Sequence, residues 1–302
     1  MLSYDGVALI HVRRSRAHAQ ERVARVALFA ASTFVVVAML AVLGYLLWSG
    51  LQLFFVDRIS PFTFLFSPDF SPDARHPGAA VFILGSIAIT LFAIAVGAPL
   101  GIAVGIFLSQ LAPPKLASFM KPAIEILVGI PSVVYGWLGL TLLAPFIRHY
   151  VGSLTGFGLL TAGIVLSIMI LPTVISLSED AMLAVATSLR EGSMALGATR
   201  WQTIWNVLLP AARSGLTVAV ILGIARAIGE ALAVQMVIGN SAMLPKGLLS
   251  PTASLTTEIV TDMGSAQQGT VLYHSLFSMG LLLLLIAMGL ILAVRLALRR
   301  RA

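Results

Sequence analysis

The chain has 302 residues, of which 59% are hydrophobic and only 10% charged, against about 25% charged in a typical soluble domain. It contains no cysteine, which excludes a disulfide framework, a thiolate zinc site and an iron–sulfur cluster. So much apolar surface suits a lipid environment, and the formal net charge of +7 is therefore interpreted as a signal of membrane topology rather than of nucleic-acid binding.

Six apolar runs approach or exceed the roughly 20 residues that a helix needs to cross a bilayer. Pro131 and Pro172 lie inside the third and fourth runs, where neighbouring helices or water must satisfy the freed carbonyl groups. The sequence predicts an all-α polytopic membrane protein with a basic tail over 1–25 and a single transmembrane domain over 26–302. The expected spans are Val26–Trp48, Ala79–Leu108, Ala123–Ile147, Leu159–Leu177, Leu216–Ile238 and Leu276–Val294.

The first run is longer than the core of a signal peptide and follows a long basic tail, so we expect it to stay in place as an anchor. The arginines and lysines outside the apolar runs divide unevenly between the two sides of the membrane, and the side with more of them is expected to be cytoplasmic. Both termini are expected on that side. Its residues are Arg13, Arg14, Arg16, Arg22, Arg25, Lys115, Lys121, Arg190, Arg200, Arg213, Arg295, Arg299, Arg300 and Arg301, against Arg58, Arg75, Arg148 and Lys246 on the other.

The cytoplasmic loop over 188–210 carries two successive helix-start patterns. Ser188 with Glu191, and Thr199 with Gln202, have the spacing of capping boxes, and Gly197 between them is placed to end the first helix in a left-handed conformation. We expect Pro210 to stop the second helix. The apolar residues Met194, Ala198, Trp201, Trp205 and Leu208 recur at spacings of three and four, which predicts one apolar helix face. The loop is therefore expected to be an ordered helix–turn–helix.

Arg226 and Glu230 interrupt an otherwise uncharged apolar stretch at membrane depth. An arginine there costs about 2.5–3.5 kcal/mol on the insertion scale, and such residues usually face a bundle interior or a polar pathway. Four residues apart on a helix, the two would share a face and lower each other's cost. An arginine fork also matches two oxygens of an oxyanion. Two interpretations stay open: a fixed ion pair between helices, and a pathway in which Arg226 leaves Glu230 as an anion passes.

Other polar residues give weaker signals. Ser132 and Tyr135 follow Pro131 and are candidates for lining a path, or for bonding a neighbouring helix; Thr90 and Thr173 have the same two interpretations. Lys121 and Glu125 are expected to form an interfacial ion pair. Gly223 and Ala227 predict close helix packing. The remaining groups, His76, His149 and His274, lack metal-ligand spacing.

No phosphate-binding loop of the form G-x-x-x-x-G-K-[ST] occurs in the sequence, so we expect no ATP hydrolysis by that route in this chain. A nucleophile elbow, an H-E-x-x-H pair and a dinucleotide-binding fingerprint are also missing from it, which argues against a membrane enzyme. Any energy from ATP then has to enter through the 188–210 loop from another subunit.

That loop resembles a known signature. Glu191, Gly197 and Leu209-Pro210 stand at the spacing of the EAA-type motif of ABC-importer permeases, with Gly192 and Ser193 in place of its two alanines and Val207 at its usual isoleucine. Four further stretches look like the phosphate-specific (Pst) importer, and more like its PstC-type than its PstA-type permease. They are Phe82–Ser86, Pro99–Ser109, Ile130–Gly136 and Gly223–Asn240, and the resemblance runs from about Ala79 to the C-terminus, with a core over about 79–294.

The resemblance implies a six-helix type I ABC importer permease in the bacterial inner membrane that forms half of a phosphate pathway. It implies a PstA-like second permease, a PstB-like ATPase dimer that holds ATP and Mg, and a PstS-like phosphate-binding protein, with no cofactor in this chain. Glu191, Gly197, Leu209 and Pro210 would then couple to the ATPase, and Arg226, Glu230, Ser132 and Tyr135 would line the path. The alternatives are a proton-coupled anion transporter that uses Glu230, and a membrane scaffold that transports nothing.

Overall fold

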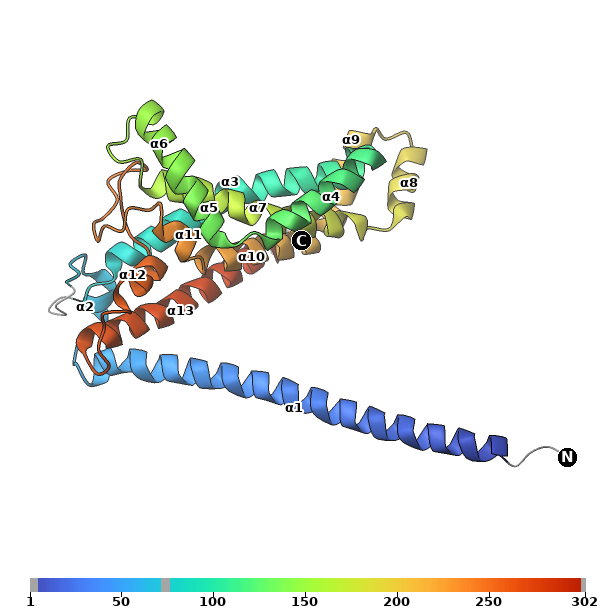
Figure 1. Cartoon of the computed structure of the whole chain (residues 1–302). Coiled ribbons are helices and arrows are strands. Elements are labelled where there is room, and N and C mark those ends of the chain that lie inside the picture. The colour runs from blue at the N-terminus through green and yellow to red at the C-terminus, as the bar shows by residue number, and fades with distance from the viewer. Residues whose placement is uncertain (1–4, 72–76, 300–302) are drawn as a thin grey trace. The chain divides into compact units, whose positions relative to one another are not determined.

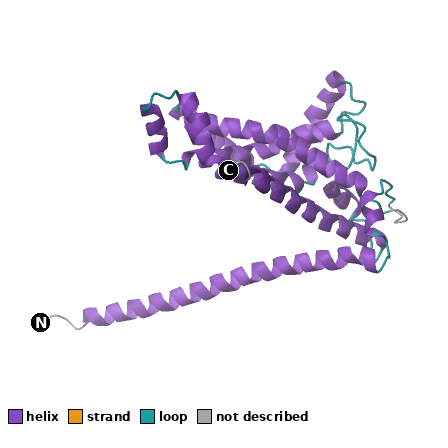
Figure 2. Ribbon diagram, turned by 180° about the vertical axis from the view of Figure 1, so that it is seen from behind, coloured by secondary structure: helices purple, strands orange, loops and turns teal. Residues whose placement is uncertain are grey.

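The computed structural model describes residues 5–71 and 77–299, and all regular secondary structure in those ranges is helical apart from one isolated β-bridge between Phe70 and Pro77 (Figure 2). The predicted all-α class is confirmed. The chain divides into two compact units, one up to Ser49 and the other from Gly50 onward. The second unit holds every candidate site.

The helices of the chain are in several cases preceded or continued by a π-helical turn, here labelled η. In order they are α1 (Asp5–Phe55), α2 (Pro61–Phe66), α3 (Ala80–Ile106), η1 (Phe107–Leu111), α4 (Pro114–Gly129), α5 (Ser132–Leu138), η2 (Gly139–Leu143), α6 (Ala144–Phe146), η3 (Ile147–Val151), α7 (Leu159–Leu183), α8 (Thr187–Ala195), α9 (Arg200–Thr203), η4 (Ile204–Leu208), α10 (Leu209–Ile228), α11 (Leu232–Gln235), α12 (Leu255–Asp262) and α13 (Val271–Arg299).

Five helical segments of the described chain are long and apolar enough to cross a membrane, and a sixth span exists if the bent pair around Pro131 counts as one. Each of the six predicted apolar runs lies wholly or mostly on one of these segments. The five are Glu21–Phe55, Ala80–Leu111, Leu159–Leu183, Arg200–Ile228 and Val271–Leu296, and the bent pair is Pro114–Gly129 with Ser132–Val151.

The third predicted span is bent by 94° between α4 and α5. Ile130, the residue before Pro131, takes an extended conformation with ψ of 128°, as the proline ring requires of its predecessor. The hydroxyl of Tyr135 donates a 2.8 Å hydrogen bond to the carbonyl of Leu127 across this bend. That carbonyl lies in the last turn of α4, so the tyrosine satisfies one of the acceptors that the break exposes.

The fifth predicted span differs from the structure at both ends. The helix ends at Ile228 rather than Ile238, because the chain leaves helical geometry over Gly229–Ala231 before α11. Pro210 does not stop a helix either, since it lies in the first turn of α10. The π-helical turn η4 ends at Leu208, just before it, and such a widened turn accommodates a proline that lacks an N–H group.

The centre of the unit is a three-helix contact of α3, α7 and α10, which run side by side (Figure 1). Three glycines of α3 at four-residue spacing lie against three residues of α7 at the same spacing. A Cβ atom on Gly97 or Gly101 would come within 2.8 Å of the side chain of Ile170 or Val174, and one on Gly105 within 2.8 Å of Ser178. Small residues of this kind let two membrane helices approach closely.

This close contact predicts that Gly101→Val destabilises the bundle by about 1–3 kcal/mol through overpacking. Gly289→Val is the matched control, because Gly289 lies within a membrane-spanning helix but has no neighbouring atom within 4 Å of a Cβ position. Thermal unfolding in detergent measures the difference. Equal melting temperatures for the two variants would contradict the packing argument.

Candidate functional site

Arg226 lies in the last turn of α10 and is half-buried. Its Nη1 atom donates a 2.8 Å hydrogen bond to the hydroxyl oxygen of Thr173 on α7. The sequence marked Thr173 as a minor candidate, and no local pattern in it indicates a partner 53 residues away. The structure therefore supports a connection between Arg226 and α7 that sequence reasoning missed.

Glu230 is not the partner of Arg226 in this structure, so the expected pair on one helix face is corrected. The helix ends at Ile228, which removes the four-residue helical spacing. The Oε1 atom of Glu230 instead accepts a 2.9 Å hydrogen bond from the backbone N–H of Ala233, and its carbonyl oxygen accepts one from the hydroxyl of Thr256. Glu230 thus holds the break between α10 and α11 in shape and ties it to α12.

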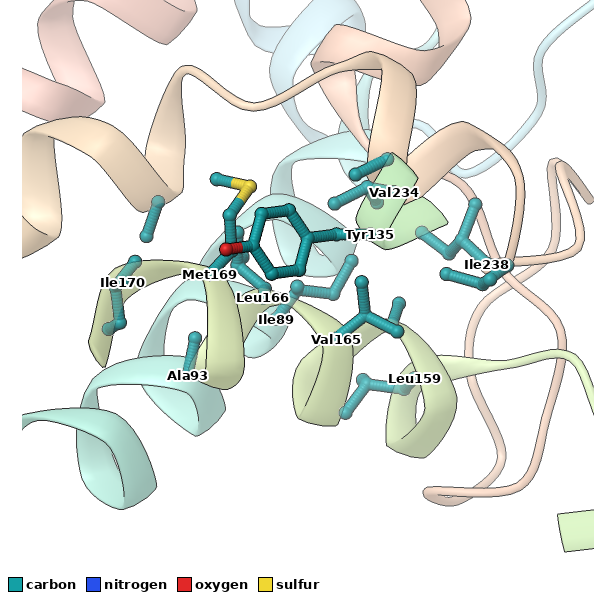
Figure 3. Packing of buried hydrophobic residues seen from close by; sticks show 14 residues of the cluster. Ile89, Ala93, Tyr135, Leu159, Val165, Leu166, Met169, Ile170, Val234 and Ile238 are labelled. Carbon is teal, nitrogen blue, oxygen red and sulfur yellow. The ribbon is translucent and has the colours of Figure 1, made fainter. Parts of the chain in front are cut away.

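Tyr135 belongs to the same buried cluster as Ala227 and Ala233, the neighbours of Arg226 and Glu230. Figure 3 shows its ring among Leu166 and Met169 of α7. Ala227 follows Arg226 directly in the chain, so the predicted site residues Tyr135 and Arg226 lie in one neighbourhood. Ser132 is half-buried at the start of α5, but no contact in the structure joins it to Arg226.

A narrow recess of about 10 Å³ adjoins Glu230 and is lined by residues of α3, α7 and α10–α12. Its polar lining comes from Ser86, Thr90, Ser254 and Thr256 together with Glu230. That volume holds about one water molecule. The recess itself is therefore too small to hold a phosphate ion.

The end of the unit that carries α8 and α9 lies opposite the end with α6, α11 and α12 (Figure 1). The capping box of Thr199 and Gln202 is confirmed, since both of its hydrogen bonds form, and Gly197 follows α8 with a φ of 86°, as predicted. The Ser188–Glu191 box is wrong. Helix α8 begins two residues earlier than that box requires, with Ala186 as its N-cap and no side-chain cap, and Glu191 is exposed.

The predicted apolar face of this loop divides into two. Leu208 is buried with Ile204, Met182 and Ala212, and Leu209 packs against that cluster, so this part fixes the loop to the bundle. Trp201 and Trp205 are instead 59% and 55% exposed. The two indoles contact each other, and Glu191 and Pro210 of the same loop are also exposed; exposed aromatic side chains of this kind are typical of a protein contact surface.

Lys121 pairs with Glu179, not with the expected Glu125. The distance from Lys121 Nζ to Glu179 Oε1 is 3.1 Å, and the glutamate side chain is only 6% exposed. The pair joins α4 to the end of α7 that leads into α8, whereas Glu125 is exposed. The four-residue spacing of Lys121 and Glu125 predicted a local pair. The buried carboxylate of Glu179 nevertheless depends more on a cationic partner than the exposed carboxylate of Glu125 does.

Lys121 and Arg226 therefore differ in how their positive charges are balanced. The charge of Lys121 is neutralised by Glu179, whereas Arg226 has only the neutral hydroxyl of Thr173 as its partner among the described residues. Arg226 consequently presents an uncompensated positive charge on α10. Such a group attracts an anion.

Two carboxyl groups lie one turn apart on α12, outside the membrane-spanning helices. Burial, the neighbouring charge of Asp262 and a hydrogen bond with that residue raise the pKa of Glu258 to about 8.

The described histidines do not gather into a metal site. The Nδ1 atom of His274, in the first turn of α13, lies 2.7 Å from Oδ2 of Asp57, and His76 lies outside the described residues. No group of three His, Cys, Asp or Glu residues in the described chain has the geometry of a metal site.

Comparison with known proteins gives consistent matches. Residues 97–301 match the family model described as a binding-protein-dependent transport system inner membrane component. The chain is 48% identical, over 97% of its length and 95% of the relative's, to the probable ABC transporter permease protein YqgH of Bacillus subtilis. It is 35% identical, over 90% of its length and 89% of the relative's, to the phosphate transport system permease protein PstC of Xylella fastidiosa.

Two solved structures share the fold. One is the MetNI methionine ABC transporter in an inward-facing conformation, with a TM-score of 0.53 and 25% identity over 72% of this chain and 90% of that one. The other is a bacterial ABC transporter involved in the import of the acidic polysaccharide alginate, with a TM-score of 0.60 over 94% of this chain and 99% of that one. At 15% identity, the second shows the fold alone.

The Lys121–Glu179 pair predicts that Lys121→Ala lowers stability by about 1–3 kcal/mol, because it leaves a buried carboxylate without its partner. Glu125→Ala is the control and should change stability little. Thermal unfolding in detergent distinguishes them. A larger loss with Glu125→Ala than with Lys121→Ala would restore the local pairing.

The raised pKa of Glu258 predicts a pH-dependent stability. The folded state holds this proton more tightly than the unfolded state, whose carboxyl titrates near 4.5, so stability falls as the pH rises from about 4.5 to about 8. Glu258→Gln should flatten the melting temperature across that window, whereas Glu125→Gln should not. An unchanged slope in Glu258→Gln would show that other groups cause the dependence.

Proposed function

This chain belongs to the family of binding-protein-dependent transport system inner membrane components, and we propose that it forms half of the translocation path of an ATP-driven importer of inorganic phosphate. Its family places it in the bacterial inner membrane as a multi-pass permease. The phosphate assignment is supported by the relatives named as PstC phosphate permeases. The observation that carries it in the structure is the uncompensated charge of Arg226.

Phosphate fits this group chemically. A guanidinium stays charged at any physiological pH and offers its N–H groups in a fork that matches two oxygens of a tetrahedral oxyanion. Only one of these groups is engaged, by a neutral acceptor. An anion that reaches Arg226 therefore gains a charge-assisted contact without first displacing a carboxylate. The pathway predicted from the sequence, in which Arg226 leaves Glu230 as the anion passes, is therefore revised: Arg226 does not have to separate from Glu230 first.

Glu230 and Tyr135 then shape the path. The carboxylate of Glu230 holds the start of α11, and the hydroxyl of Tyr135 holds the bend before α5. Gly136 of α5 packs directly on α11, since a Cβ atom there would lie 2.8 Å from the Cα of Ala233. The two broken segments thus support each other beside Arg226, as interrupted helices do at the midplane sites of other transporters. Ser132 remains a proposed lining residue at the entrance of α5.

The energy enters through the loop between α7 and α10. In the proposed orientation both termini and this loop face the cytoplasm, where the exposed Trp201, Trp205 and Glu191 meet a cleft of a PstB-like ATPase dimer that binds ATP and Mg. Gly197 sets the turn of the loop. Leu209 and Pro210 join it to α10 without a break, so a displacement of the loop moves the helix that carries Arg226.

Two further partners complete the proposed assembly. A PstA-like permease supplies the second half of the path, and a PstS-like protein delivers phosphate at the side opposite the ATPase. The alternative of proton coupling through Glu230 has less support, because its carboxylate is committed to the backbone of α11. Uptake driven by a proton gradient in vesicles with this chain alone would favour the alternative.

The proposal predicts that Arg226→Gln lowers phosphate uptake at least about 100-fold and Arg226→Lys about tenfold, since lysine keeps the charge but loses the fork. The assay is ATP-dependent uptake of labelled phosphate by the assembled transporter in proteoliposomes. Arg213→Gln removes an exposed arginine from the same helix and serves as the control. Normal uptake by both Arg226 variants would end the pathway interpretation.

A further inference from the structure

We propose that Thr173 is a positioning residue for Arg226, whose hydroxyl holds the guanidinium in the orientation that receives the anion. The inference rests on the proposed function and adds a residue to it. Its direct observation is the 2.8 Å hydrogen bond from Arg226 Nη1 to Thr173 Oγ1, which joins α10 to α7. Three features of the structure support it.

The first feature is that the Thr173 hydroxyl bonds a side chain of another helix and not a carbonyl of its own helix. Ser and Thr side chains inside helices commonly donate to a carbonyl one turn earlier in their own helix. Other hydroxyls in the described helices of this chain follow that habit: Ser167 bonds the carbonyl of Gly163, Thr141 that of Trp137 and Thr217 that of Arg213. The hydroxyl of Thr173 is instead engaged by a side chain of another helix.

The second feature is the rigidity of the backbone that carries Thr173. The next residue, Val174, is fully buried and fits between two glycines: its side chain lies 2.7 Å from the Cβ position of Gly101 on α3 and 3.0 Å from that of Gly223 on α10. A side chain enclosed on two sides cannot shift without moving both helices. The position of Thr173 is therefore fixed relative to α3 and α10 together.

The third feature is the register of Arg226. Gly223 precedes it by three residues on α10, which places both on the same helix face toward α7. The contact of Gly223 with Val174 thus fixes the rotation of α10 about its axis, and that rotation brings Arg226 to Thr173. The hydrogen bond follows from backbone packing, so the guanidinium starts from one orientation rather than from many.

The chemistry of the pair suits an oxyanion. A guanidinium has five N–H groups, and the hydroxyl accepts from Nη1 while leaving further N–H groups to a bidentate partner. The hydroxyl oxygen is a neutral acceptor, so it orients the cation without cancelling its charge. An acidic residue at this position would hold the guanidinium more tightly but would compete with the anion. Threonine at this position thus orients the guanidinium of Arg226 and still leaves its charge available to an anion that binds and departs.

The test is ATP-dependent phosphate uptake by the assembled transporter with Thr173→Val, Thr173→Ser and Thr173→Ala. Valine keeps the shape of threonine without its acceptor, whereas serine keeps the acceptor. Because the binding protein captures phosphate from solution, we expect Thr173→Val and Thr173→Ala to lower the maximal uptake rate about tenfold, as for a lost hydrogen bond to a charged group, with the apparent KM unchanged. Thr173→Ser should stay within about twofold of the parent.

Thr217→Val is the matched control, because it removes a hydroxyl that bonds its own helix, and it should transport normally. Assembly with the partner subunits is measured first for every variant. Normal uptake by Thr173→Val while Arg226→Gln is inactive would overturn this inference and leave the proposed function intact. An equal loss in Thr173→Ser and Thr173→Val, or failure of both Thr173→Val and Thr173→Ala to assemble, would also overturn it, since packing would then explain the residue. Normal uptake by Arg226→Gln would overturn the proposed function itself.

Discussion

The close approach of α3, α7 and α10 is the constraint on which the rest of the second unit depends. Glycines of α3 accept the side chains of α7 at four-residue intervals, and Val174 fills the space between Gly101 and Gly223. Lipid offers no hydrophobic drive for helices to associate, so packing at this distance supplies much of their attraction. The same contact sets the rotation of α10, and through it the position of Arg226, whose partner among the described residues is the hydroxyl of Thr173.

Two breaks in the helices lie beside this closely packed centre. The bend at Pro131 and the interruption after Ile228 place α5 and α11 against each other beside Arg226. Each break is satisfied by a side chain, Tyr135 in one case and Glu230 in the other. Residues that resemble transport groups from their charge or polarity thus serve first to hold irregular backbone in a membrane, where an unpaired polar group costs several kcal/mol. A role in the path is compatible with that structural one, because the backbone they hold lies next to the charge.

Local signals in the sequence were reliable where the interacting groups are close together in the chain. The capping box of Thr199 with Gln202 and the left-handed Gly197 depend on a few neighbouring residues, and the apolar runs depend on length alone. The same local logic was wrong for Lys121 with Glu125 and for Ser188 with Glu191. In the first case a buried carboxylate on another helix competes more strongly. In the second, α8 begins two residues earlier, without a side-chain cap.

The sequence by itself determined the membrane setting, the all-α class and the family, and it singled out Arg226 as a candidate, because composition, hydrophobic run length and a costly intramembrane charge are properties of the chain alone. Only the tertiary structure decided which group holds that charge. Thr173 lies 53 residues from Arg226, and their contact depends on how two helices pack, which no spacing along the chain encodes. The separation of Glu230 from Arg226 was likewise decided in three dimensions, since the helix ends before the glutamate and its carboxylate turns to α11.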